Sequence, residues 1–179
     1  MFDSLSHPLT FPTYSSVKEY EAQGNWAVKK YYLPPWRFFY RHKIRMIERA
    51  LRGRHFDTMM DFGAGPGIMT LEWQKYAGHV YSIDRDNELY PKVDMTICSS
   101  VMEFVPLKKT FEKLSSLTKE IIIASPMDTA ASRLYFNSIN DRIARNSHQD
   151  ILKEMAGYFT INYFRSWHGL YFCARGRKR

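Results

Sequence analysis

The sequence is poor in cysteine, has no long apolar run and contains no internal repeat. A transmembrane helix needs about 20 consecutive, mostly apolar residues, and no stretch approaches that length. The two cysteines, Cys98 and Cys173, fall within apparent strands and lack the spacing of metal ligands. We therefore expect buried free thiols in a reducing, cytoplasmic environment and no bound metal. Residues 1–8 have neither a basic start nor an apolar stretch, so we expect no secretion signal.

Two common catalytic motifs are also absent. The sequence contains neither the Gly-x-Ser-x-Gly turn that presents a hydrolase nucleophile nor the His-Glu-x-x-His pair of zinc proteases. No pattern of residues predicts a catalytic triad either. The sequence therefore gives no support to these classes of hydrolase.

Positive charge is in excess, because 26 Lys and Arg against 18 Asp and Glu give a net charge of +8. The excess gathers in residues 29–54 and 175–179, which favours an anionic partner: nucleic acid, an acidic metabolite or an anionic membrane surface. The length of 179 residues fits one domain. Within 1–179 we expect an N-terminal arm and helical segment (1–54), a core (55–174) and a solvated basic tail (175–179).

The apolar periodicity predicts alternating helices and strands. Helices are expected at about 17–30, 35–51, 68–76, 107–117 and 149–156, and strands at about 79–83, 93–98, 120–124, 160–165 and 170–174. Ser147 should cap the last helix and Gly157 should stop it. The last two strands are close enough in sequence to form a hairpin. A polar stretch at 127–147 is the natural place for a segment that faces the substrate.

The stretch Met59-Met60-Asp61-Phe62-Gly63-Ala64-Gly65-Pro66-Gly67 places three glycines at alternate positions after an apolar run that ends in an acid. Glycine allows both a sharp backbone turn and the close approach of a ligand. A strand, this loop and a following helix form the first half of a nucleotide-binding βαβ unit. The alternative is a glycine turn between strand and helix with no ligand.

A second acid, Asp84, follows the glycine loop by about 20 residues. It comes directly after the expected strand at 79–83. An acid at the carboxyl end of a strand at this spacing is typical of a ligand for the two hydroxyls of an adenosine ribose, and such charge-assisted hydrogen bonds are strong. The alternative is an ordinary surface acid in the turn at residues 84–87.

The glycine-rich run and the acid after it resemble the first two signatures of class I S-adenosylmethionine (SAM) dependent methyltransferases. The resemblance extends from about Val17 to Ala174. It implies a three-layer, Rossmann-like α/β fold whose mostly parallel sheet ends in a C-terminal antiparallel hairpin, with an N-terminal helical lid over the cofactor's methionine end. It also implies SAM as the cofactor, S-adenosylhomocysteine as the product, and no metal.

The resemblance assigns cofactor binding to a set of residues at the carboxyl edge of the sheet. These are Asp61, Phe62, Gly63, Ala64, Gly65, Gly67, Asp84, Arg85, Ser99 and Ser100. We expect Gly65, the middle glycine, to pass closest to the cofactor. Tyr32 could face the sulfonium, because aromatic faces attract cations, and Arg41 could pair with the cofactor's carboxylate. Core packing and a solvated helix face explain these two residues equally well.

One interval departs from the family. Val93, in the next strand, follows Asp84 by only nine residues, where the family has a helix, a third strand and another helix. We therefore expect the third strand to be missing and the sheet order to be 2-1-4-5-7-6 in the family's labels. Residues 87–91 or a neighbouring subunit of a homo-oligomer would then cover the adenine, or the adenine would be exposed.

The segment Val101-Met102-Glu103-Phe104-Val105 resembles a family segment that reads roughly Val-Leu-Glu-His-Val. The Asn/Asp-Pro-Pro-Tyr signature of enzymes that methylate amines of nucleobases and glutamine is absent, which argues against those substrates. Methyl transfer needs at most one base, and the candidates are Glu103, His148 and His168. A lone histidine is more often structural than catalytic.

Three functions stay open from the sequence. The first is a SAM-dependent methyltransferase acting on a small or lipid-like, anionic acceptor. The second is an RNA methyltransferase, which the two basic clusters suggest. The third is a domain that binds SAM without methylating and serves as a sensor or scaffold, which the shortened core suggests.

Overall fold

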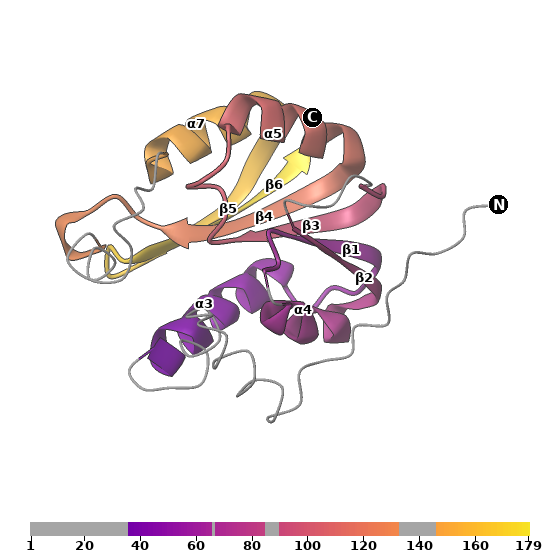
Figure 1. The fold of residues 1–179 in the computed structure, drawn as a ribbon, viewed down its shortest axis with the longest axis horizontal. Coiled ribbons are helices and arrows are strands. Elements are labelled where there is room, and N and C mark those ends of the chain that lie inside the picture. Colours follow the sequence, from indigo (N-terminus) through magenta and orange to yellow (C-terminus); the bar gives the residue numbers. More distant parts are fainter. Residues whose placement is uncertain (1–35, 66, 85–89, 133–145) are drawn as a thin grey trace.

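The computed structural model describes residues 36–65, 67–84, 90–132 and 146–179. They form one six-stranded sheet with helices on both faces (Figure 1). The strands are β1 (Phe56–Phe62), β2 (Ala77–Ile83), β3 (Val93–Ser99), β4 (Thr118–Pro126), β5 (Phe159–Trp167) and β6 (Tyr171–Lys178). The helices are α3 (Trp36–Leu51), α4 (Ile68–Trp73), the short 3₁₀ helix η1 (Gln74–Tyr76), α5 (Leu107–Leu117) and α7 (His148–Tyr158). The expected helix at 17–30, Tyr32 and Arg85 lie outside the described residues.

The strand order is β2-β1-β3-β4-β6-β5. Strands β1 to β4 are parallel, and β6 runs antiparallel to both β4 and β5. In the family's labels this is the expected order 2-1-4-5-7-6 without a third strand, so the prediction of the sheet is confirmed. Among the described residues β2 is the outermost strand on its side, which follows from the short interval between Asp84 and Val93.

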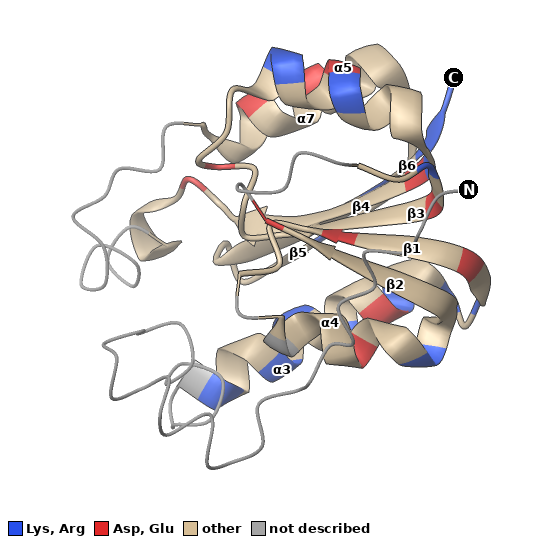
Figure 2. Cartoon of the chain, turned by 45° about the vertical axis from the view of Figure 1, so that its right-hand side comes forward, with Lys and Arg blue, Asp and Glu red and all other residues tan. Residues whose placement is uncertain are grey.

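The sheet has two separate cores, one on each face. Helices α3 and α4 cover one face, and α5 and α7 cover the other (Figures 1 and 2). Met46, Ile47 and Leu51 of α3 are buried in the first core, and Phe111 of α5 with Met155 of α7 in the second. Strands buried on both faces need nearly continuous apolar sequence, and residues 121–124 of β4 provide it. The α/β three-layer fold is therefore as predicted.

Helix α3 belongs to the layer that packs on the sheet. Its inner stripe contains the buried side chains of Lys43, Met46, Ile47 and Ala50. Arg175 Nη1 of β6 donates to the carbonyl of Ala50 at 2.7 Å, which ties the end of α3 to β6. The lid function expected of this helix stays a prediction.

The end of the chain is structured, so the prediction of a solvated basic tail at 175–179 is wrong. Residues Arg175 to Lys178 belong to β6, and Arg175 is only 3% exposed. A Cβ on Gly176 would lie 2.7 Å from Met155 Cε, so this strand packs closely under α7. The charged residues after Ala174 gave no apolar pattern that would predict a strand. The register of this part of β6 is set by its pairing with β4 and β5.

The cap of α7 is confirmed and its predicted stop is wrong. Ser147 Oγ accepts from the backbone N–H of Asp150, and Asp150 accepts from the backbone N–H of Ser147, which makes a capping box. Gly157 lies inside the helix, which continues to Tyr158 and leads directly into β5. Burial of Ile151 and Met155 outweighs the cost of about 1 kcal/mol for a glycine in a helix.

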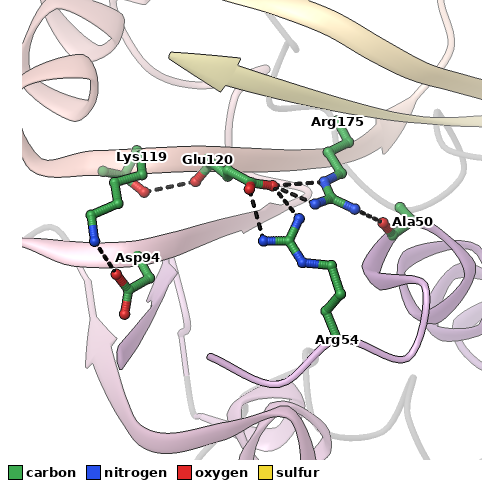
Figure 3. A network of polar contacts seen from close by, with 7 residues as sticks. Ala50, Arg54, Asp94, Lys119, Glu120 and Arg175 are labelled. Carbon is green, nitrogen blue, oxygen red and sulfur yellow. Dashed lines mark hydrogen bonds and ion pairs between the residues drawn. The ribbon is translucent and has the colours of Figure 1, made fainter. Parts of the chain in front are cut away.

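An ion-pair network fastens the amino-terminal half of β4 to its neighbours (Figure 3). Glu120 accepts from Arg54 Nη2 at 2.9 Å and from Arg175 Nε at 2.9 Å, and Arg175 Nη2 also contacts it. Burial alone would raise the pKa of Glu120, but the two guanidinium groups outweigh it and hold the pKa below its usual value. The negative charge of Glu120 therefore compensates the positive charge of the buried Arg175.

We expect Glu120→Gln to lower the free energy of unfolding by about 2 kcal/mol at neutral pH, because it removes charge-assisted hydrogen bonds from a buried guanidinium. The pKa of Glu120 is lower in the folded state, so its stabilisation is present above the unfolded value near 4.5 and is lost as the pH falls through the folded value. Urea unfolding across acidic pH measures this. Glu112→Gln, on the exposed side of α5, is the control, and an equal effect of both variants would contradict the assignment.

Candidate functional site

The carboxyl ends of the four parallel strands meet at one edge of the sheet, where ligands bind in open α/β folds. Phe62 of β1 is in register with Ile83 of β2 and with Cys98 of β3, and Ser99 of β3 is in register with Ala124 of β4. The residues that follow these strands therefore gather at one edge. They are the glycine loop after β1, Asp84 after β2, Ser100 to Glu103 after β3, and Ser125 near the end of β4.

The glycine loop is held against the neighbouring strand. The backbone N–H groups of Gly63 and Ala64 donate to the carbonyl of Ile83 at 2.8 and 3.1 Å, and Gly67 N–H donates to Ala64 O at 3.0 Å. These bonds fix the loop beside Asp84, which is exposed at the end of β2. The structure therefore brings together the two motifs that the sequence singled out.

Glycine is favoured at the three positions of this loop for different structural reasons. Gly63, Gly65 and Gly67 all have positive φ, of 75°, 54° and 74°, which favours glycine at each position. A Cβ on Gly63 would lie 2.4 Å from Val101 Cγ2, so Gly63 is required for packing against the segment after β3. A Cβ on Gly65 would have no atom of the described residues within 4 Å, its chain neighbours aside. Gly65 thus presents bare backbone to open space, as a close approach to a ligand requires.

Asp61 supports the loop from inside. It is 1% exposed and accepts from Thr70 Oγ1 of α4 at 2.7 Å, which links the two ends of the loop. Burial raises the pKa of Asp61 to about 6, against the opposing effects of the Thr70 hydrogen bond and the positive charge of Lys43. The described hydrogen bond of Asp61 shapes the loop, and its contact with a cofactor stays a prediction.

Phe62, at the end of β1, contacts a residue that the sequence indicated only as part of the range 87–91. The ring centroids of Phe62 and Tyr90 lie 6.3 Å apart, and Lys113 Nζ of α5 lies 3.2 Å from the centre of the Tyr90 ring. Tyr90 is half-buried. Residues 85–89 lie outside the described residues, and Tyr90 is the first described aromatic residue after Asp84.

Lys43 is the site residue that sequence reasoning missed. Its Nζ donates to Ser100 Oγ at 3.0 Å and lies 4.7 Å from the centre of the Tyr40 ring, although the residue is only 1% exposed. Ser100 has a φ of 54°, and its N–H donates to Ala124 O at 2.8 Å, so the chain turns sharply after β3. A buried ammonium group thus reaches the carboxyl edge from α3.

Glu103 lies at the same edge of the sheet, where the charge of Lys43 acts on it. It is 4% exposed and accepts from Ser125 Oγ at 2.9 Å. Burial raises the pKa of Glu103, while its backbone hydrogen bond, the Ser125 hydroxyl and the charge of Lys43 act in the opposite direction. Asn146 holds the surrounding segment in place, because its Nδ2 donates to the carbonyls of Met102 and Val105 at 2.8 and 2.7 Å.

The two candidate histidines lie in different surroundings, and their role as bases stays a prediction. His148 Nδ1 accepts from the backbone N–H of Asp128 at 3.0 Å, so in the neutral ring Nε2 carries the proton and cannot accept another. His168 is exposed in the turn between β5 and β6, with a φ of 46°. The third predicted base, Glu103, is buried at the carboxyl edge, and burial raises its pKa.

The remaining predicted residues lie as follows. Ser99 Oγ contacts Met69 Sδ of α4 at 3.3 Å, and Arg41 lies on the exposed side of α3. Their contact with a cofactor stays a prediction. No group of three or more His, Cys, Asp or Glu within the described residues could hold a metal ion, and none of the described helices is long and apolar enough to cross a membrane. Cys98 and Cys173 are buried free thiols, as expected.

No protein-family model and no curated protein sequence matches the chain. Several solved structures, however, are similar to the chain. The N-methyltransferase NodS from Bradyrhizobium japonicum WM9, in complex with S-adenosylhomocysteine, is similar with a TM-score of 0.65 and 11% identity, over 94% of this chain and 99% of that one. The magnesium protoporphyrin IX methyltransferase ChlM from Synechocystis PCC 6803, with bound S-adenosylhomocysteine, is similar with a TM-score of 0.58 and 14% identity, over 87% of this chain and 88% of that one.

A third similar structure is the geranyl diphosphate C-methyltransferase from Streptomyces coelicolor A3(2), in complex with Mg²⁺, geranyl-S-thiolodiphosphate and S-adenosylhomocysteine. Its TM-score is 0.60 and its identity 11%, over 80% of this chain and 77% of that one. Identities this low show a shared fold. The acceptors named for these enzymes differ from one another, so the fold alone does not choose an acceptor.

Proposed function

Because the chain has the Rossmann-like fold of class I SAM-dependent methyltransferases, we propose that it transfers the methyl group of SAM to a small or lipid-like, anionic acceptor. One observation carries the proposal: the glycine loop is hydrogen-bonded to the carbonyl of Ile83 beside Asp84, with open space over Gly65. When bound, the cofactor supplies a methyl group already activated by its sulfonium. The protein's task is therefore mainly to position and desolvate the reactants.

The residues present fit this cofactor. Gly65 is exposed, with no described side chain within 4 Å of an added Cβ, and Asp84 is an exposed carboxylate directly after β2, suited to accept from two ribose hydroxyls. Asp61 and Thr70 hold the two ends of the loop together from below. The resemblance in the sequence and the geometry of the edge support the same assignment.

An anionic acceptor is supported by Lys43 together with Glu103. The ammonium group of Lys43 is buried at the carboxyl edge, where a charge is screened little by water and acts strongly on a bound anion. Glu103 is a carboxyl whose pKa is raised by burial, which brings its basicity closer to neutral pH and suits it to accept a proton from the acceptor. One of the similar structures is an enzyme of geranyl diphosphate, an anionic prenyl ester.

The proposal is tested by the release of S-adenosylhomocysteine, measured by mass spectrometry. The full chain is incubated with SAM and separate panels of small carboxylates and phosphates, prenyl and acyl esters, and RNA. Release that depends on a member of the first two panels supports the proposal. Release only with RNA would favour the RNA methyltransferase that the sequence left open. SAM binding without release on any panel would favour the non-catalytic sensor or scaffold.

We expect Asp84→Ala to weaken SAM binding by about 2–4 kcal/mol, because it removes a charged acceptor for two hydroxyls. This corresponds to a rise in Kd of about 30- to 1,000-fold. Calorimetric titration with SAM measures it. Asp57→Ala is the matched control, since Asp57 is an exposed acid near the opposite end of the neighbouring β1. A Kd within about twofold of wild type for Asp84→Ala would overturn the ribose assignment.

A further inference from the structure

Helix α3 carries a continuous row of cations on its outer side, visible as blue segments in Figure 2. Arg37, Arg41, Arg45 and Arg49 recur every four residues, and all four are exposed. We call these four residues the arginine row. With a rise of about 1.5 Å per residue, the row spans about 18 Å along the helix. This length suits an extended anion better than a small one.

The arginine row is not neutralised by acids of its own helix. Glu48 is the only acidic residue of α3, and it is turned toward η1, where it pairs with Lys75 Nζ at 2.7 Å. Among the described residues no ion pair involves any member of the row. The positive charge of the row therefore faces outward and is available to a partner.

Aromatic side chains border the same row. Phe38 is 62% exposed, and its ring centroid lies 5.9 Å from that of Trp167 at the end of β5. Trp167 stacks on His42 with centroids 4.1 Å apart. We call Phe38, His42 and Trp167 the aromatic corner. It joins the first turns of α3 to the hairpin of β5 and β6, so rings and cations share one surface.

The cations of the hairpin extend the charge around this corner. Burial lowers the pKa of His42, and the positive charges of Arg49, Arg45, His168 and Arg165 lower it further. Arg165 and His168 belong to β5 and to the turn after it, and both are exposed. Two elements far apart in the sequence thus place cations on both sides of the aromatic corner.

The combination indicates which kind of anion fits. An amphipathic helix that lies in a lipid surface buries its apolar face in the membrane. The apolar face of α3 is not available, because Met46, Ile47 and Leu51 are buried against the sheet with exposed fractions of 2%, 0% and 0%. A row of cations with exposed rings is typical of surfaces that follow a phosphate backbone and stack unpaired bases. Unpaired bases are regular features of RNA loops and ends.

We propose that the arginine row and the aromatic corner bind single-stranded RNA. The row contacts successive phosphates, and the exposed ring of Phe38 stacks on a base. This interaction concerns binding alone and does not depend on methyl transfer, so it can stand or fall separately from the proposed enzymatic activity.

The test uses the full chain and a fluorescein-labelled oligouridylate, followed by fluorescence anisotropy. Wild type is expected to bind with a Kd in the range of about 10⁻⁴–10⁻⁶ M at physiological salt, as non-specific nucleic-acid binding does. If four phosphates are neutralised, the slope of log K against log salt should be about −2.8, since each contributes about −0.7 for single strands. Absence of binding even at low salt would overturn the proposal.

Charge reversal locates the surface. Arg45→Glu/Arg49→Glu should weaken RNA binding at least about tenfold and reduce the salt slope by about 1.4. Lys108→Glu/Lys109→Glu, on the exposed side of α5 on the other face of the sheet, changes the net charge equally and should leave binding within about twofold. Equal losses would show a general effect of charge and overturn the proposal. The milder Arg45→Gln/Arg49→Gln and Lys108→Gln/Lys109→Gln pairs serve if the reversed variants fail to fold.

Two further arms separate RNA from other anions. Phe38→Ala should weaken oligouridylate binding at least about fivefold, the loss of one stacked base, while leaving inorganic polyphosphate binding unchanged. An equal effect on both ligands would exclude base stacking. Phosphatidylserine vesicles are expected not to compete with RNA for wild type. Vesicle binding in the absence of RNA binding would show that the surface is a membrane site and would overturn the proposal.

Discussion

Gly65→Val is expected to abolish SAM binding while the sheet stays folded. Gly65 is exposed, and a Cβ added to it meets no atom of the described residues within 4 Å apart from its chain neighbours, so we expect no clash with the described part of the chain. It would instead fill the open space over the loop where we place the cofactor. Because φ at Gly65 is 54°, a valine there also introduces backbone strain of about 1–3 kcal/mol. Strain and ligand exclusion must therefore be separated.

Gly53→Val provides that separation. Gly53 lies after α3, has a φ of 66° and likewise has nothing within 4 Å of an added Cβ, so it carries the same strain away from the glycine loop. Both variants should lose similar stability in thermal melts, but only Gly65→Val should lose binding in a calorimetric titration with SAM. If Gly65→Val binds SAM as Gly53→Val does, the cofactor does not lie over this loop.

Glu103→Gln is expected to lower kcat by about 10²–10⁴-fold, the usual contribution of a positioned general base, with SAM affinity unchanged. Glutamine keeps the size of the side chain and can keep the contact with the Ser125 hydroxyl, so the buried segment should remain in place. The wild-type rate should rise with pH as Glu103 loses its proton. Because burial raises its pKa, this rise is expected above the usual range of a glutamate, and the variant should lack it.

Ser125→Ala tests the role of Glu103 by removing its hydrogen-bond partner. The Ser125 hydroxyl donates to Glu103 and favours its ionised form, so its removal should raise the pKa of Glu103 further. The acid limb of the rate profile should then move to higher pH, with the maximal rate little changed. A limb that stays in place in Ser125→Ala, or persists in Glu103→Gln, would assign the limb to another group.

The sheet and the glycine loop could be predicted from the sequence because their signals are local. Glycines follow β1 at alternate positions, an acid follows β2, and the nine-residue step from Asp84 to Val93 leaves no room for a further strand with its two helices. Parallel pairing then brings these strand ends to one edge without further information. The strand order 2-1-4-5-7-6 followed from the same reasoning and is confirmed.

The residues that the sequence did not reveal depend on contacts between distant segments. Lys43 lies within the helix expected at 35–51, and its place at the site depends on Ser100, which is 57 residues away. Arg175 appeared as part of a charged tail, and its partner Glu120 is 55 residues away. No local pattern predicts that a lysine or an arginine will be buried, because burial of a charge is decided by the partner that compensates it.

The most direct test of the account is the melting temperature of the wild-type chain with and without SAM or S-adenosylhomocysteine. A ligand that binds only the folded state stabilises it, by about 2.7 kcal/mol at 100 times its Kd. The account predicts a rise of several degrees that grows with ligand concentration, and that is absent in Gly65→Val but present in Gly53→Val. No shift in the wild type at millimolar concentrations of either ligand would contradict it and would leave the glycine loop as a structural turn.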